Sequence, residues 1–131
     1  MTKIFISQPM NGKTTEEIEN ERNYIIDRLR ENECVEIIDS FFKDKPYEAS
    51  PLWYLGESIK LMSEADVVFF CNGWQTARGC QIEHDCALEY GIDTMYEEDL
   101  IFCLLKQSDY QIQPSYLLMV AKRRLVQIFI V

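Results

Sequence analysis

The residues best suited to chemistry lie in the segment GWQTARGCQIEHDCALEYG, from Gly73 to Gly91, with Glu83 near its centre. The run ADVVFFC at 65–71 is typical of a buried β-strand, because it is unbroken and rich in β-branched and aromatic residues. Residues 80–90 contain good helix formers, and Gly91 is a natural helix stop. The sequence therefore predicts a strand, a turn and then a helix with Glu83 in its first turn.

In that position Glu83 would stand where a carboxylate can act on a ligand. In a parallel α/β sheet, the loop after a strand and the start of the next helix open onto the edge where ligands bind. Unpaired N–H groups and the positive end of the helix dipole favour the ionised form there. The helical period puts Glu83 on one stripe with Ala87 and Tyr90, on or beside the packed face. The alternative is a glutamate that only complements the helix dipole, and the sequence leaves both interpretations open.

The elements around Glu83 alternate between strand and helix. Strands are predicted at 3–7, 35–42, 65–71 and 93–96, and helices at 16–32, 52–63 and 80–90. The threonines before the first helix and the glutamates at its start predict a capping box. This alternation favours an α/β fold with a mainly parallel sheet and helices on both faces. Two further strands at 101–105 and 125–131 and a helix at 114–122 are the expectation for the C-terminal residues.

Composition limits the partners. The 131 residues are expected to form one domain, and 22 acidic against 13 basic residues give a formal net charge of −9. This charge repels phosphate backbones and anionic membranes, so neither a nucleic-acid nor a membrane partner is expected, whereas a small anionic ligand needs only a few local cations. The five cysteines lack C-x-x-C spacing, which predicts a reducing, cytoplasmic compartment and no zinc site. No metal, organic cofactor, secretory leader or membrane-spanning stretch is expected.

Three stretches together carry a resemblance to a known family. KIFISQPMNGK at the N-terminus, EADVVFF in the middle and then GW..ARGC.IEH.CA.EYG resemble a small bacterial and phage family of uncharacterised proteins. That family is related to the nucleoside 2-deoxyribosyltransferase superfamily, which includes nucleotide N-glycosidases. The resemblance covers roughly residues 1–98. It implies a flavodoxin-like three-layer fold with a mainly parallel four- to five-stranded sheet, assembled as a homo-oligomer, a dimer or larger, with 99–131 as a C-terminal extension.

The resemblance also implies a reaction. Glu83 matches the glutamate that attacks the anomeric carbon in these enzymes, which implies an N-glycosidase or deoxyribosyltransferase-like activity on a nucleoside or nucleotide. A carboxylate can stabilise or trap the oxocarbenium-like state through which an N-glycosidic bond breaks. The opening loop of such enzymes borders the base and the sugar. It corresponds here to the candidate substrate-binding residues Ser7, Gln8, Met10, Asn11 and Gly12.

The turn before Glu83 departs from the transferases. They carry an extra acidic residue in a D-x-G-T-like turn, where this chain has Gln75-Thr76-Ala77-Arg78. The proton for the leaving base would then come from elsewhere, and the candidates are Asp66, His84 and Asp39. A non-catalytic binding module for a nucleotide-derived small molecule is therefore an alternative function, and a domain that mainly serves assembly is a third.

Three residues of this turn complete the candidate substrate-binding set. Arg78 beside a helix N-terminus suits a phosphate or carboxylate, which favours a nucleotide, although a structural clamp is an equal alternative. Trp74 is a candidate for stacking on a base or for anchoring the turn. Gly79 lies between Arg78 and Cys80, whose thiol pKa is expected to be lowered by the helix N-terminus. His84 is expected to be an ordinary surface or interface histidine.

Overall fold

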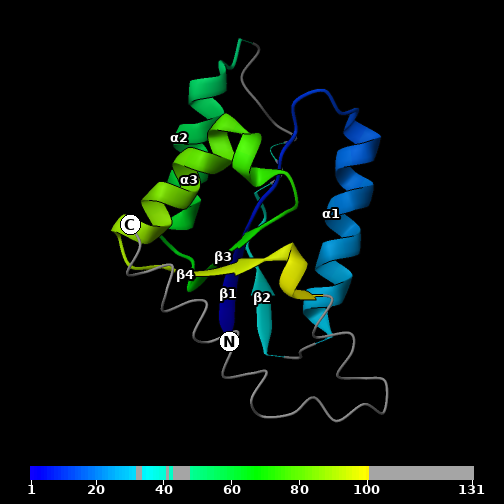
Figure 1. Cartoon of the computed structure of the whole chain (residues 1–131), viewed down its shortest axis with the longest axis vertical. Coiled ribbons are helices and arrows are strands. Elements are labelled where there is room, and N and C mark those ends of the chain that lie inside the picture. The colour runs from blue at the N-terminus through cyan, green and yellow to red at the C-terminus, as the bar shows by residue number, and fades with distance from the viewer. Residues whose placement is uncertain (32–33, 41, 43–47, 101–131) are drawn as a thin grey trace. The chain divides into compact units, whose positions relative to one another are not determined.

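The computed structural model describes residues 1–31, 34–40, 42 and 48–100 (Figure 1). Its elements in chain order are β1 (Thr2–Ser7), α1 (Thr15–Arg30), β2 (Val35–Ile37), α2 (Pro51–Met62), β3 (Val67–Phe70), the 3₁₀ turn η1 (Trp74–Thr76), α3 (Arg78–Glu89) and β4 (Asp93–Tyr96). The chain divides into two compact units between Glu97 and Glu98, and all these elements belong to the first unit, Met1–Glu97. The elements predicted at 101–105, 114–122 and 125–131 lie outside the described residues.

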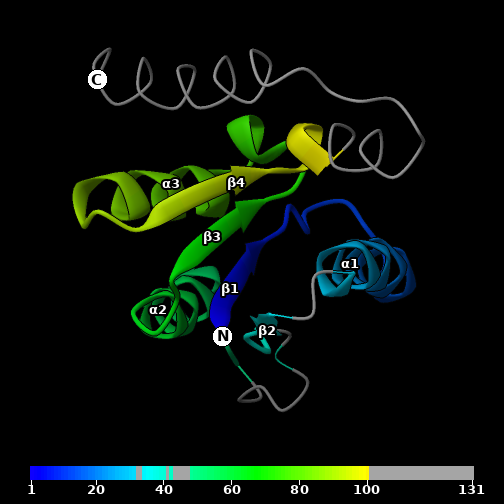
Figure 2. The same cartoon turned by 90° about the horizontal axis from the view of Figure 1, so that it is seen from below.

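The strands form one four-stranded sheet in the order β2-β1-β3-β4, and every pair is parallel. Figure 2 shows α1 on one face of this sheet and α2 with α3 on the other. The prediction of an α/β fold with a parallel sheet is confirmed, and the strand order is that of the flavodoxin-like three-layer fold. Within the described residues, no helix is long and apolar enough to cross a membrane.

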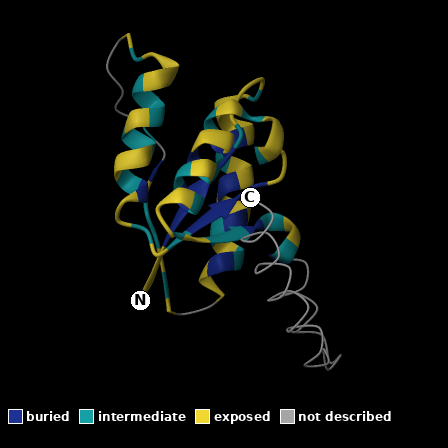
Figure 3. Cartoon of the chain, turned by 60° about the vertical axis from the view of Figure 1, so that its left-hand side comes forward, coloured by how far each residue is buried: buried dark blue, intermediate teal, exposed yellow. Residues whose placement is uncertain are grey.

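Apolar side chains hold α2 and α3 against the sheet. The core on this face consists of Phe5, Met62, Val68, Phe70, Ala87 and Tyr96. Alternation along β1 and β3 sends every second side chain to this face. Figure 3 shows the buried residues concentrated in the strands and on the helix faces that cover them. The helices therefore have fixed positions relative to the strand ends, which is what a site built between them requires.

The local signals place the ends of most elements within a few residues of the predicted positions. The predicted capping box is confirmed at α1, where Thr14 Oγ1 accepts from the backbone N–H of Glu17 and the Glu17 carboxylate accepts from that of Thr14. Gly91 ends α3 with a φ of 68°, as a helix-stop glycine does. The strand predicted at 35–42 is shorter and stops at Ile37.

Candidate active site at the carboxyl ends of β1 and β3

The site lies where the chain reverses its direction of winding. Ser7 pairs with Phe70 and Phe70 pairs with Tyr96, so the last residues of β1, β3 and β4 form one row across the sheet. The chain leaves β1 toward α1 on one face and leaves β3 toward α3 on the other (Figure 2). Such a switch point at the carboxyl edge is where open parallel sheets bind ligands. The two loops also meet, because a Cβ placed on Gly73 would lie 3.7 Å from Cγ of Pro9.

Glu83 is buried on the inner face of α3, at 8% exposure. Glu83 and Ala87 share a buried stripe, as predicted, and Cys80 belongs to it as well. Tyr90, which was also predicted on this stripe, is 83% exposed because α3 ends before it. The helix starts at Arg78 rather than near residue 80, so Glu83 is its sixth residue and lies in the second turn. The prediction of a first-turn glutamate is therefore wrong.

The same difference changes the charge state of Glu83. Burial raises the pKa of Glu83 to about 7, and the Ser7 hydroxyl acts in the opposite direction by favouring the carboxylate. The expectation that the helix N-terminus keeps the group ionised fails, because that effect fades beyond the first turn while the cost of desolvation does not. Neither Glu83 Oε2 nor Ser7 Oγ has a well-formed hydrogen bond to a described residue. The site therefore holds a buried carboxyl group that is poised between its two protonation states.

Burial changes the pKa of Cys80 in the same direction as that of Glu83. Its thiol is buried, and burial raises its pKa to about 11, although the Ser7 hydroxyl again acts in the opposite direction. The lowered pKa expected from its place near the helix N-terminus is wrong, because desolvation outweighs the dipole for this group. A neutral thiol beside Glu83 neither attacks a substrate nor neutralises the carboxylate.

The opening loop does not meet Glu83 as a whole. Gln8 is buried, but its Nε2 donates to the Ile18 carbonyl at 3.0 Å and to Glu21 Oε2 at 3.3 Å, on the α1 side of the sheet. Alternation along β1 explains this, since neighbouring side chains point to opposite faces. Met10, Asn11 and Gly12 are exposed in the turn that follows. Of the predicted loop residues, Ser7 is the one brought against Glu83.

Several hydrogen bonds hold the turn after β3. Asn72 N donates to Glu97 Oε2 at 2.6 Å, and Thr76 Oγ1 donates to the Gly73 carbonyl at 3.1 Å. Gln81 Nε2 donates to the Gln75 carbonyl. Gly73 has a φ of 88°, which an L-residue adopts only with strain. This turn is therefore a defined support for the residues that follow it.

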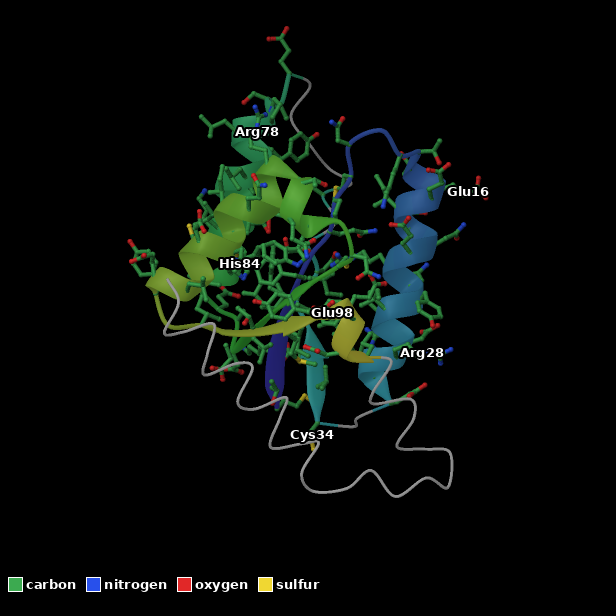
Figure 4. All side chains as sticks on the ribbon, viewed as in Figure 1. Glu16, Arg28, Cys34, Arg78, His84 and Glu98 are labelled. Carbon is green, nitrogen blue, oxygen red and sulfur yellow. The ribbon has the colours of Figure 1, made fainter. Side chains whose placement is uncertain are left out.

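Arg78 and Gly79 begin α3 directly after this turn (Figure 4). Arg78 is exposed and forms no salt bridge with any described residue. The described residues therefore provide no acidic partner for the alternative role of Arg78 as a structural clamp. The N-cap residue Ala77 offers no side-chain acceptor to the first N–H groups of the helix. A guanidinium and free N–H groups thus stand together at the start of α3.

Trp74 and His84 form a stacked pair, with ring centroids 4.1 Å apart and an interplanar angle of 28°. His84 Nε2 also lies 2.8 Å from the Tyr96 hydroxyl. His84 was expected to be an ordinary surface or interface histidine. The surface alternative is wrong, since His84 is half-buried among aromatic rings and burial lowers its pKa, and the interface alternative stays a prediction. Of the two roles weighed for Trp74, its contacts are those of an anchor for the turn.

The other two candidates for a leaving-group acid interact with groups other than Glu83. Asp66 Oδ2 accepts from the backbone N–H of Lys3 at 2.8 Å, at the amino end of the strands. Asp39 follows β2 on the chain and interacts electrostatically with Arg22. In the described part of the chain, no three or more His, Cys, Asp or Glu residues are arranged to hold a metal ion.

Arg22 is a buried charge that the sequence interpretation missed. It is 5% exposed, and its Nη2 donates to Ser40 Oγ at 2.9 Å and to the Ile38 carbonyl at 3.4 Å. Burial lowers the pKa of Arg22, and the nearby Asp39 opposes that shift. The available signal was its position, because it falls on the helical stripe formed by Ile18, Ile25 and Leu29. Arg22 ties α1 to the segment after β2 and so braces the carboxyl edge.

Comparison with solved structures supports the fold. The crystal structure of a conserved protein from Enterococcus faecalis V583 is similar, with a TM-score of 0.59 and 17% sequence identity. The likeness covers 73% of this chain and 62% of that protein's chain, so this chain spans less than two thirds of its length. At this identity the likeness concerns the fold alone. No curated protein matches the sequence significantly.

The family comparison covers most of the first unit. Residues 2–96 match the family described as Domain of unknown function (DUF4406). These residues include all four strands, the turn after β3 and every candidate site residue from Ser7 to Glu83. The chain therefore belongs to the DUF4406 family.

Proposed function

We propose that this protein is an N-glycosidase or deoxyribosyltransferase-like enzyme that acts on a nucleoside or nucleotide, with Glu83 as the nucleophile. The observation that carries the proposal is the buried Glu83 carboxyl group, whose Oε2 has no hydrogen-bond partner among the described residues, at the switch point of a parallel sheet. A titratable group with a perturbed pKa at such a place is a candidate for catalysis. With a pKa of about 7, roughly half of the Glu83 side chains are ionised at neutral pH.

The reaction divides into two displacements. The Glu83 carboxylate attacks the anomeric carbon while the bond to the base breaks, and the base leaves with the bonding electron pair and takes up a proton from water or an acid of the site. Water, or the nitrogen of a second base, then displaces the glutamate from the glycosyl ester. The Ser7 hydroxyl lies against Glu83 and favours the ionised form, which is the nucleophilic one. Burial supports the same step, because a poorly solvated carboxylate does not have to shed water before it attacks.

Arg78 and the free N–H groups at the start of α3 favour a nucleotide over a nucleoside. A phosphate is bound well by a helix N-terminus and by a guanidinium, and both are present at Arg78 and Gly79. The exposed part of the opening loop, Met10 to Gly12, follows Ser7 at the other side of the switch point and would contact the base and sugar. Trp74 would contribute by holding the turn that carries Arg78.

The test is incubation of the pure protein with ribo- and deoxyribonucleosides and their 5′-monophosphates, followed by chromatography for released bases. Glu83→Ala is compared with Glu89→Ala, which removes an exposed carboxylate from the same helix. We expect base release from the wild type and from Glu89→Ala and none from Glu83→Ala. Equal release by the two variants would contradict the proposal.

The second candidate is a binding module that holds a nucleotide-derived molecule without cleaving it. It is favoured by the turn 75–78, which has no carboxylate, and by Asp66, which lies at the opposite edge of the sheet. Equilibrium dialysis distinguishes the two functions. A binding module retains one compound saturably and returns it intact, whereas an enzyme returns free base.

The proposal also covers the partners, the assembly and the compartment of the protein. We propose a small-molecule partner, neither a nucleic-acid nor a membrane partner, and assembly as a homo-oligomer in the cytoplasm, on the basis of net charge, cysteine spacing and the family resemblance. Light scattering on the whole chain and on a chain truncated after Glu98 tests the assembly. A monomeric whole chain would contradict it.

A further inference from the structure

Four aromatic rings form a cluster at the carboxyl ends of β3 and β4. This aromatic cluster consists of Phe70, Trp74, His84 and Tyr96. Phe70 and Tyr96 are the last, paired residues of their strands, with ring centroids 5.8 Å apart. The other two rings belong to the turn after β3 and to α3. The cluster therefore joins four consecutive parts of the chain, which are the end of β3, the turn, α3 and the end of β4.

His84 contacts each of the other rings in this cluster. It stacks on Trp74 at 4.1 Å, meets Phe70 edge to face at 4.9 Å, and places Nε2 within 2.8 Å of the Tyr96 hydroxyl. The hydrogen bond fixes the rotation of the imidazole about its own axis, and the stacking then fixes the plane of the Trp74 ring. An aliphatic side chain at position 84 would supply neither restraint.

Neighbouring residues on α3 serve different strands. Glu83 lies against Ser7 at the end of β1, whereas His84 lies against the ends of β3 and β4. This follows from the rotation of about 100° per residue along a helix. Figure 4 shows His84 on α3 below Arg78, which begins the same helix. Of these two adjacent residues of α3, Glu83 is thus the candidate nucleophile, and His84 contacts the turn that precedes the helix.

We propose that His84 is a positioning residue that, through Trp74, holds the turn 72–78 in the conformation in which Arg78 and Gly79 receive the substrate. The role of the turn in receiving a substrate rests on the proposed function, whereas the contact by which His84 holds the turn does not. The turn is also held by hydrogen bonds at exposed positions, from Asn72 N, Thr76 Oγ1 and Gln81 Nε2, and by backbone hydrogen bonds within it. The Trp74 ring also lies 5.3 Å from that of Phe70 and 5.7 Å from that of Tyr96. The exposed bonds compete with water, and the Trp74–His84 pair has the shortest centroid separation of the three ring contacts of Trp74, so we assign the main side-chain restraint on the turn to this half-buried contact.

The loss of His84 should weaken substrate binding and leave the chemical step nearly unchanged. Ring pairs of this kind stabilise by an amount that corresponds to about a three- to tenfold change in an equilibrium. His84→Ala should therefore raise KM about three- to tenfold and change kcat less than about twofold. This is the result expected when the lost interaction stabilised the bound substrate and the transition state equally. A general acid at this position would instead lower kcat.

The direct readout is the fluorescence of Trp74. The chain has two tryptophans, so a Trp53→Phe background leaves Trp74 as the single emitter. In that background we expect His84→Ala to move the emission to longer wavelength, because Trp74 gains contact with water. His84→Phe keeps a ring and should restore the emission, and Asp85→Ala, an exposed neighbour on the same helix, should leave it unchanged.

These outcomes separate the two proposals. An emission maximum unchanged in both His84→Ala and His84→Gln, with circular dichroism showing folded protein, would overturn the positioning role. An unchanged KM together with a reduced kcat in His84→Ala would overturn it as well. If no substrate releases base, the proposed function fails by itself, while the emission shift with Phe rescue still supports the contact between His84 and the turn.

Discussion

Ser7 and Phe70 lie opposite each other at the last paired position of β1 and β3. Their strands lead to helices on opposite faces of the sheet (Figure 2), and the loops that follow them come close again at Gly73 and Pro9. Glu83 approaches from α3 to the Ser7 side of this row, and His84 to the Phe70 side. The candidate site is therefore a consequence of the strand order together with two adjacent residues of one helix.

Stability should depend on pH through Glu83. Below pH 4 the carboxyl group is protonated in both the folded and the unfolded chain, and between about pH 4.5 and 7 the unfolded chain loses this proton first. The folded state then binds more protons, so the free energy of unfolding falls as pH rises, by up to about 3 kcal/mol, and levels off above pH 7. Urea unfolding from pH 4 to 8 measures this. Glu83→Gln should remove the decline, and a decline that persists in that variant would assign it to other groups.

The rate of base release should rise with pH. The proposed nucleophile is the Glu83 carboxylate, and burial raises the pKa of Glu83 to about 7. We expect kcat/KM to increase from pH 5.5 to 8 with a midpoint near 7, because the ionised fraction grows over this interval. Initial rates at a substrate concentration well below KM provide the profile. A rate that falls across the same interval would show that Glu83 acts as a protonated acid instead.

Gly79→Ala should separate stability from binding. A Cβ at Gly79 would meet no atom within 4 Å, and the same holds for Gly56 in α2, which serves as the matched control. Each change should stabilise the fold by about 0.5–1 kcal/mol, since alanine is the better helix former. Thermal melts check the stability. Only Gly79→Ala should slow base release, because its methyl group stands at the start of α3, where the phosphate is proposed to bind. A fully active Gly79→Ala would remove Gly79 from the site.

Arg22 should contribute to stability through its buried volume and its hydrogen bond to Ser40. Arg22→Ala leaves a cavity on the inner face of α1 and removes the donor to Ser40, so we expect a loss of about 2–4 kcal/mol in the free energy of unfolding. Arg22→Met retains most of the volume and should lose less. Arg30→Ala, at an exposed position of the same helix, should change stability by less than about 0.5 kcal/mol. An Arg22→Ala variant as stable as Arg30→Ala would show that the edge is not braced in this way.

Local patterns in the sequence were sufficient to predict the elements. The apolar run around Val68, the capping pair Thr14 and Glu17 and the helix stop at Gly91 act over a few residues, and each is confirmed. The start of α3 was misplaced because Arg78 and Gly79 carry no strong helix-start signal and Ala77 is not a capping residue. That small error moved Glu83 out of the first turn.

The remaining features of the site depend on contacts between distant parts of the chain. The pKa of Glu83 is set by burial among strands that no local pattern around Glu83 reveals. His84 was misassigned because its partners are a turn residue, Trp74, and a strand end, Tyr96. Arg22 could have been found from the sequence, since a charge on an apolar helical stripe indicates that a buried partner must lie opposite it.

The most direct test of the central claim is a single-turnover measurement of base release by Glu83→Gln and wild type, with protein in excess over the best nucleotide or nucleoside substrate. Glutamine keeps the size and burial of Glu83 but cannot form the glycosyl ester. We expect the variant to be slower by about a thousandfold or more while its circular dichroism is unchanged. A Glu83→Gln rate within about tenfold of wild type would contradict the assignment of Glu83 as the nucleophile.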